Sequence, residues 1–215
     1  MSLRLLVTIV ISLVVLGAAA PAVLGTATEL GATQSPPPPS CPADPCQAVS
    51  RTTGFQAKIG DVKDPMVVPN DGRVVAFSIA LGAPNPEQVK FFQDNLGGES
   101  RARLTVLDRD GRSYRVRGQS EDFDLTPYFG KTAQFALDRT IPVTKGQVVA
   151  LTIPTWAPAL AVGLDRKDGW RASRGKDECD DTKGQSAQDM RDSARYACLY
   201  RTARLTYSAT LITTP

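Results

Sequence analysis

The side chains available for chemistry are limited first by the absence of histidine from the chain. Without an imidazole, Ser-His-Asp and Cys-His catalytic groups and the commonest general base are excluded. Closely spaced carboxylates remain, in Glu121, Asp122 and Asp124 and in the pair Asp165 and Asp168. Two carboxylates at a fixed separation can hydrolyse a glycosidic bond, so a histidine-free carboxylate hydrolase is one functional alternative. Nothing in the sequence fixes that separation. We therefore expect exposed carboxylates, no catalytic residue and no enzyme.

Aromatic side chains beside turns are better candidates for binding than the carboxylates are for catalysis. Trp156 lies between two prolines after an apolar run, and Trp170 follows a polar turn and precedes Arg171. Tyr128 lies in another proline-containing turn. On a β-sandwich loop, an exposed aromatic face can stack on a sugar while an arginine bonds its hydroxyls. These four residues are the candidate ligand-binding residues, and the alternative is that both tryptophans cap the core.

Four cysteines, Cys41, Cys46, Cys179 and Cys198, allow three disulfide pairings. We favour Cys41–Cys46, a short ring that contains prolines, and Cys179–Cys198, which encloses a polar and poorly patterned segment. In the alternative, an N-terminal cysteine links the preceding arm to the region of residues 179–198. There is no Cys-x-x-Cys motif and no histidine to complete a zinc site, so we expect neither a metal nor a cofactor.

The N-terminal segment has the layout of a secretory signal peptide. Arg4 precedes an apolar run over residues 5–24, and small residues and a proline close it. We predict a signal peptide over residues 1–25 and a secreted, extracellular or cell-surface location, where cysteines oxidise. The apolar run has about the ~20 residues that span a bilayer, so an uncleaved membrane anchor is the alternative. Contact with a membrane is expected only through this segment.

Composition divides the rest of the chain into two parts. Residues 26–40 are rich in small residues and end near Pro36–Pro39, a run that forms a stiff polyproline spacer. We predict a proline-rich linker there. Residues 41–215 are of a suitable length for one domain with a sizeable core.

Hydrophobic patterning predicts that this domain is all-β. Apolar residues alternate along Arg73–Leu81, and Asp110-Gly111 separates two alternating segments, which predicts a hairpin. Further runs typical of strands cover 132–137, 147–153, 159–164 and 199–212. Turn signals recur at short intervals, so we predict an antiparallel β-sandwich of the jelly-roll-like type.

One short helix is predicted near residues 85–96, inserted among the strands. Asn85 can cap it, Pro86 is suited to its first turn, and Gln88 completes a capping box. Gly97 and Gly98 end the apolar stripe. We expect this helix to close one end of the sandwich.

Charge gives little information about a partner. Lys and Arg number 25 against 22 Asp and Glu, for a net charge of +3. The most basic stretch, Arg101–Arg117, is interrupted by Asp108 and Asp110. A nucleic-acid interface needs a larger and cleaner basic patch, so we expect no nucleic-acid partner.

Several stretches resemble a family of secreted bacterial proteins without assigned function. These stretches are Thr53–Gln56, Asp71–Phe77, Pro127–Gly130, Lys145–Ala161, Trp170–Arg174 and Cys198–Tyr207. The resemblance implies a bacterial, secreted protein but carries no catalytic or binding residue with it. The order of strands and turns is also loosely similar to jelly rolls of the galactose-binding type, which is an analogy of fold and not of function.

The sequence therefore favours a non-catalytic β-sandwich domain of the cell envelope or exterior that binds a glycan or another ligand. The alternative from a different class is a structural domain that binds another surface protein. An exposed apolar patch or an unpaired strand edge would favour that alternative.

Overall fold

The computed structural model describes residues 25–181 and 184–213. The predicted signal peptide therefore lies outside the described residues, apart from its last one. Within the described part of the chain, no helix is long and apolar enough to cross a membrane.

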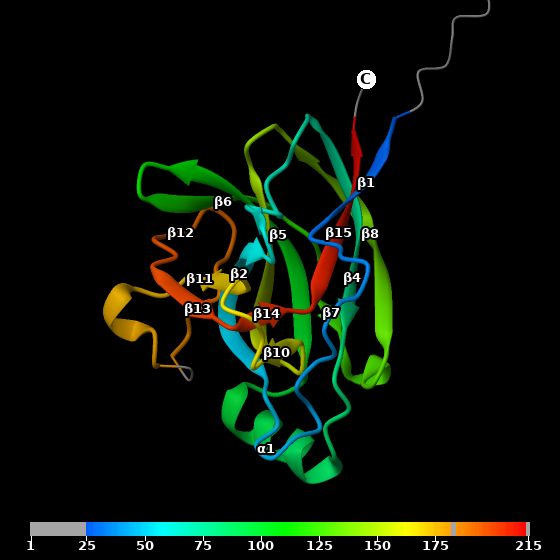
Figure 1. Cartoon of the computed structure of the whole chain (residues 1–215), viewed down its shortest axis with the longest axis vertical. Helices are drawn as coiled ribbons and strands as arrows, with labels where there is room; N and C mark the ends of the chain where they lie inside the picture. The colour runs from blue at the N-terminus through cyan, green and yellow to red at the C-terminus, as the bar shows by residue number, and fades with distance from the viewer. Residues whose placement is uncertain (1–24, 182–183, 214–215) are drawn as a thin grey trace, which may run out of the picture.

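Two antiparallel sheets pack face to face and confirm the predicted β-sandwich (Figure 1). The four-stranded sheet contains, in order, β1 (Ala27–Leu30), β15 (Tyr207–Thr213), β4 (Gly72–Ala80) and β8 (Thr132–Val143). The nine-stranded sheet runs in the order β12 (Ser193–Ala194), β6 (Ser113–Gln119), β5 (Arg101–Asp110), β9 (Val148–Ala157), β2 (Val49–Ile59), β11 (Gly169–Ala172) and β13 (Cys198–Arg201), with β3 (Val62–Lys63) beside β2 and β7 (Phe123–Asp124) beside β5. A separate two-stranded ribbon is formed by β10 (Leu160–Val162) and β14 (Ala203–Leu205). In Figure 1, β14 lies between β13 of the larger sheet and β15 of the smaller one.

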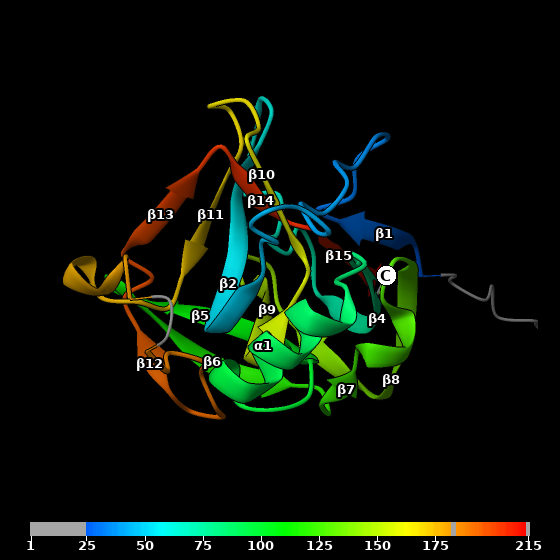
Figure 2. The same ribbon diagram turned by 90° about the horizontal axis from the view of Figure 1, so that it is seen from below.

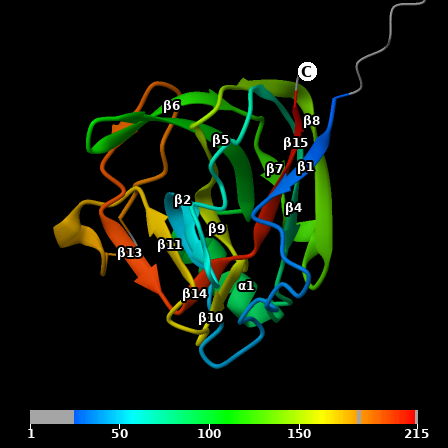
Figure 3. The same cartoon turned by 45° about the horizontal axis from the view of Figure 1, so that its top comes forward.

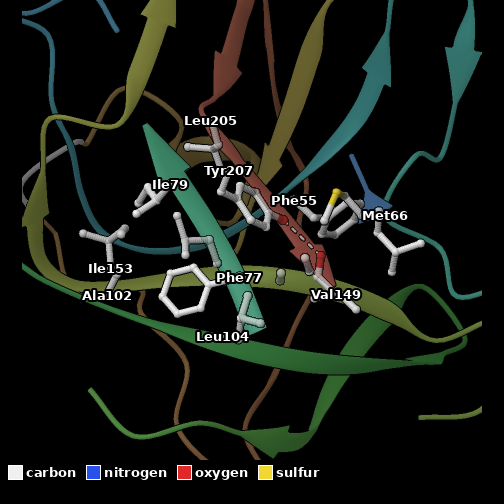
Figure 4. Close-up of a cluster of buried hydrophobic side chains, with 14 of the residues drawn as sticks. Phe55, Met66, Phe77, Ile79, Ala102, Leu104, Val149, Ile153, Leu205 and Tyr207 are labelled. Atoms are coloured by element: carbon white, nitrogen blue, oxygen red, sulfur yellow. Dashed lines mark hydrogen bonds between the residues drawn. The ribbon is translucent and has the colours of Figure 1, made fainter. Parts of the chain in front are cut away.

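The main core fills the space between the two sheets (Figure 4). Phe77 on β4 points toward Leu104 on β5, and both side chains are fully buried. Tyr207 on β15 crosses to the other sheet, where its hydroxyl donates a hydrogen bond to the Val149 carbonyl oxygen of β9 at 3.0 Å. Apolar burial provides most of the driving force, and this bond satisfies a hydroxyl that has no access to water.

The central strands β2, β9 and β5 are buried on their outer face as well. Thr152 on β9 lies at the middle of a row of hydroxyls, 2.8 Å from Thr53 Oγ1 on β2 and 2.6 Å from Thr105 Oγ1 on β5. The segment between β11 and β13 covers this row, because the Gln188 backbone N–H donates to Thr53 Oγ1 and the Thr53 N–H donates to Ser173 Oγ. Buried threonines are tolerated here because their hydroxyls bond one another.

The predicted helix is present as α1 (Pro86–Leu96). Asn85 Oδ1 accepts from the Gln88 N–H at 2.9 Å, and Gln88 Oε1 accepts from the Asn85 N–H at 3.0 Å. Two 3-10 turns, Thr126–Tyr128 and Lys176–Glu178, complete the helical structure that the described residues show. Figure 2 looks toward the end of the sandwich that α1 covers, as predicted.

Two predicted segments differ from the structure. Residues 26–40 contain β1, which pairs with β15 and buries Leu30, so the packed domain begins before Cys41. The run at 199–212 is not one strand but three, β13, β14 and β15, which belong to three different sheets. Thr202 has a positive φ of 55°, and the break there lets the chain leave the nine-stranded sheet. Alternation alone did not reveal the two breaks within residues 199–212 because apolar residues recur throughout that run.

Replacing Tyr207 with phenylalanine should lower the free energy of unfolding by about 1–2 kcal/mol, since a buried inter-sheet hydrogen bond is lost while the ring is kept. Urea titration followed by circular dichroism measures the change. Tyr128→Phe is the control, because this side chain is 39% exposed and the substitution should cost under about 0.5 kcal/mol. Equal losses in the two variants would contradict the assigned role of Tyr207.

Stability should also fall at alkaline pH. Burial raises the pKa values of Tyr196 and Tyr207 above the ordinary tyrosine value of 10.0. Above that pH the unfolded chain loses phenolic protons that the folded chain keeps, so the free energy of unfolding decreases as pH rises. Their contribution is fully present below pH ~10. Urea midpoints measured through this range should decrease, and Tyr196→Phe should reduce the slope. An unchanged slope in that variant would exclude Tyr196 as a cause.

Candidate functional site

A groove of about 460 Å³ opens between the β11–β13 edge of the nine-stranded sheet and the β10–β14 ribbon. In Figures 2 and 3, β11 and β13 extend on the side of the molecule away from β4 and β8. The residues that line the groove come from parts of the chain that are distant in sequence. They are Gln47, Ala48, Val49, Ser50, Thr52, Leu160, Val162, Trp170, Arg174, Leu199, Tyr200, Arg201, Thr202 and Ala203.

Two stacked aromatic rings form one wall of this groove. Trp170 on β11 and Tyr200 on β13 are directly opposite each other in the register, and their ring centroids lie 4.6 Å apart at an interplanar angle of 27°. The indole lies close over Gly54 of β2, where an added Cβ would come within 2.7 Å of the Trp170 ring. Glycine at that position leaves the room that the tryptophan ring occupies beside β2.

The indole N–H is the unusual atom in this wall. Trp170 Nε1 is buried and has no hydrogen-bond partner among residues 25–181 and 184–213. A buried donor without an acceptor costs about 1–3 kcal/mol.

Arg174 brings a buried positive charge to the same groove. Its two terminal nitrogens donate to the Gly184 and Ser50 carbonyl oxygens at 3.0 and 2.9 Å, which fixes the guanidinium. Burial raises the pKa of the neighbouring Tyr200, and the Arg174 charge acts in the opposite direction. The remaining walls are mostly apolar, with Leu160, Val162 and Ala203 among them. Apolar walls with a few fixed polar groups are typical of small-molecule sites.

The second disulfide holds the groove in shape. Cys179 and Cys198 are bonded, as are Cys41 and Cys46, which are the two pairings favoured from the sequence. The Tyr200 hydroxyl donates to the Cys179 carbonyl oxygen at 2.6 Å. The disulfide thus fixes the loop that in turn orients the outer aromatic ring.

Trp170 and Arg171, which are adjacent in sequence, point to opposite faces of β11. Arg171 Nη1 donates to the Tyr196 carbonyl oxygen at 3.2 Å on the outer face of the sheet. There Arg171 lines a second hollow of about 250 Å³, together with Lys58, Arg166 and other charged residues. The structure therefore does not place these two candidate residues in a single pocket.

The other two aromatic candidates lie elsewhere. Trp156 is 0% exposed and packs on Phe92 of α1, with ring centroids 4.8 Å apart, and its Nε1 donates to the Gly98 carbonyl oxygen. This placement agrees with the core-capping alternative and joins the helix to β9. Trp170 is buried in the main core cluster as well, so the alternative holds for the burial of both tryptophans. Tyr128 is partly exposed and packs edge-on against Phe135 of β8, away from the groove.

The carboxylates considered for catalysis each hold local structure. Glu121 accepts from the Asp138 N–H, Asp122 pairs with Arg103 at 2.9 Å, and Asp124 accepts from the Thr126 N–H. Asp165 and Asp168 lie in one turn, where Asp165 accepts from the Lys167 N–H and Asp168 from the Gly60 N–H. No group of three or more potential metal-ligating side chains occurs within the described ranges.

Sequence reasoning missed Tyr200 and Arg174. The sequence around Tyr200 indicated only an alternating strand. It did not indicate that this strand pairs with β11 and so places Tyr200 opposite Trp170. Arg174 follows Trp170 at an even spacing, which places both on one face of an extended chain. That spacing was the available signal. Comparison of the chain with protein-family models, curated proteins and solved structures finds no match.

Removing the second disulfide should destabilise the fold more than removing the first. Replacing Cys179 and Cys198 with alanine should cost about 3 kcal/mol, and replacing Cys41 and Cys46 about 2 kcal/mol, because the stabilisation grows with the loop that is closed. The bonded cysteines are 19 and 5 positions apart, respectively. Denaturant unfolding of both double variants measures the difference. A larger loss for the shorter loop would contradict this order.

Proposed function

We propose that this protein is a non-catalytic, extracellular or cell-envelope β-sandwich that binds a glycan in the groove beside β11 and β13. The observation that carries the proposal is the wall formed by the stacked pair Trp170 and Tyr200, beside the guanidinium of Arg174 that backbone carbonyl oxygens hold in place. Two disulfides support an oxidising location outside the cytoplasm.

The chemistry of the groove suits a saccharide. A volume of about 460 Å³ falls within the range of about 300–1,000 Å³ that is common for ligand sites. The C–H face of a sugar ring is apolar and packs on aromatic or aliphatic walls. Its hydroxyls accept and donate hydrogen bonds, and Gln47 and Thr202 among the lining residues can bond them.

A second candidate function is binding of another surface protein through a strand edge. β13 is the last strand in the order of the nine-stranded sheet, and an exposed edge can pair with an extended peptide. However, β13 has only four residues and ends where Thr202 adopts a positive φ. A short, bent edge offers few backbone hydrogen bonds, so the groove is the better supported site.

The proposal is tested by glycan-array screening followed by calorimetry. Val162→Glu places a charge on an exposed wall residue and should weaken binding of any array hit by about 10-fold or more, since buried contacts are lost. Tyr200→Ala should weaken it similarly by removing the outer ring. Tyr128→Ala, which removes a partly exposed aromatic away from the groove, is the matched control.

Thermal unfolding of each variant shows whether the fold is kept, which matters most for Tyr200 because it contacts the disulfide loop. If Tyr128→Ala weakens binding as much as Val162→Glu, the groove is not the site. If no glycan on the array binds the intact protein, the glycan proposal fails.

A further inference from the structure

The hollow on the outer face of β11 is strongly cationic. Its basic side chains come from β2, β3, the turn before β11, β11 itself and β13, and they face two carboxylates. They are Lys58, Lys63, Arg166, Arg171 and Arg201, with Asp64 and Asp168. Lys63, Arg166 and Arg201 are exposed, while Lys58 and Arg171 are half-buried.

Most of this positive charge is not balanced within the described part of the chain. The ion pairs there include none with Lys58, Lys63, Arg166, Arg171 or Arg201. Asp168, in contrast, already lies 4.0 Å from Arg204 Nε, and Asp61 at the nearby turn pairs with Lys167 at 2.7 Å. Asp61 and Asp168 therefore have partners of their own. Asp64 alone cannot balance the five basic side chains of the hollow, so the excess charge there is positive.

The hollow and the groove meet along β13. Leu199 and Arg201 line both spaces. Of the consecutive residues Trp170 and Arg171, the first lines the groove and the second lines the hollow. Since β13 is the edge strand, no further strand of this sheet separates the two spaces. A chain-like ligand held in the groove can therefore pass over this edge and reach the basic side chains.

From this continuity we infer that the ligand of the groove is an acidic saccharide. A sugar ring lies against the partly exposed ring of Tyr200, which Trp170 backs from inside. An anionic substituent, a carboxylate, sulfate or phosphate, lies over the cationic hollow. Guanidinium groups suit such oxygens because they donate two parallel hydrogen bonds. The inference rests on the proposed glycan function and adds the charge of its ligand.

A nucleic acid fits this surface less well. Single strands bind along open grooves in which bases stack on exposed aromatic rings. This groove offers one partly exposed ring, that of Tyr200, because Trp170 behind it is only 5% exposed. One ring can hold one sugar unit but cannot stack successive bases. The basic side chains also form one compact hollow and not a track along the molecule.

The experiment uses three acidic probes of different chemistry: a short oligogalacturonate, a sulfated heparin fragment and a mannose phosphate oligosaccharide. Each is compared with its neutral form, which is carboxyl-reduced, desulfated or dephosphorylated. Oligothymidylate serves as a polyanion that lacks a pyranose chain. Binding is measured by calorimetry with the intact domain at low and high salt.

The test variant replaces Lys58, Lys63 and Arg166 with glutamine. The matched control replaces Lys131, Arg139 and Lys145, which are exposed residues of the other sheet and its flanking turns. Both variants lose the same charge. At least one acidic probe should bind more tightly than its neutral form, weaken in high salt, and lose about 10-fold or more in affinity in the test variant only.

If neutral and acidic forms bind equally, or if both variants bind like the intact protein, the ligand is not selected by charge and only this inference is overturned. If oligothymidylate binds as tightly as the best saccharide, the hollow is a general polyanion surface and the inference is also overturned. If no saccharide binds, the proposed function fails together with it.

Discussion

Burial of both faces of β2, β9 and β5 is the constraint on which the rest of this structure depends. The inner faces pack on the four-stranded sheet, and the outer faces are covered by the segment between β11 and β13. That segment has few apolar residues, so it is held by hydroxyl and amide hydrogen bonds to Thr53 and its neighbours instead. Because these groups are buried, each bond that is lost leaves an unsatisfied partner, which makes the arrangement specific.

The groove follows from the same constraint. The segment that covers the outer face also delivers Arg174, the Cys179 loop and Tyr200 to the edge of the sheet. β11 and β13 extend that sheet beyond the four-stranded one. On their inner face, Trp170 belongs to the main core and also lines the groove, with Tyr200 packed against it. Gly54 leaves room for the Trp170 ring, and Tyr200 covers that ring from the groove side.

Much of the fold could be predicted from local sequence because the signals are short-range. The capping box around Asn85 sets where α1 begins, and the Asp110-Gly111 turn sets the hairpin of β5 and β6. Both depend on residues within a few positions of each other. The division of residues 199–212 among three sheets could not be predicted in this way. It is decided by which distant strand each part pairs with, and alternation is the same in every case.

The candidate site shows the same limit for chemistry. The sequence by itself determined that no imidazole is present, that the cysteines can pair as they do, and that Trp170 and Arg171 lie beside a turn. Only the tertiary structure decided that Trp156 belongs to the core and that Trp170 meets Tyr200. It also decided where charge gathers: Arg103 of the basic stretch is paired with Asp122, whereas lysines and arginines from separate segments converge on β11. The physical reason is that stacking, pairing and burial depend on distance in space, which strand order sets and sequence separation does not.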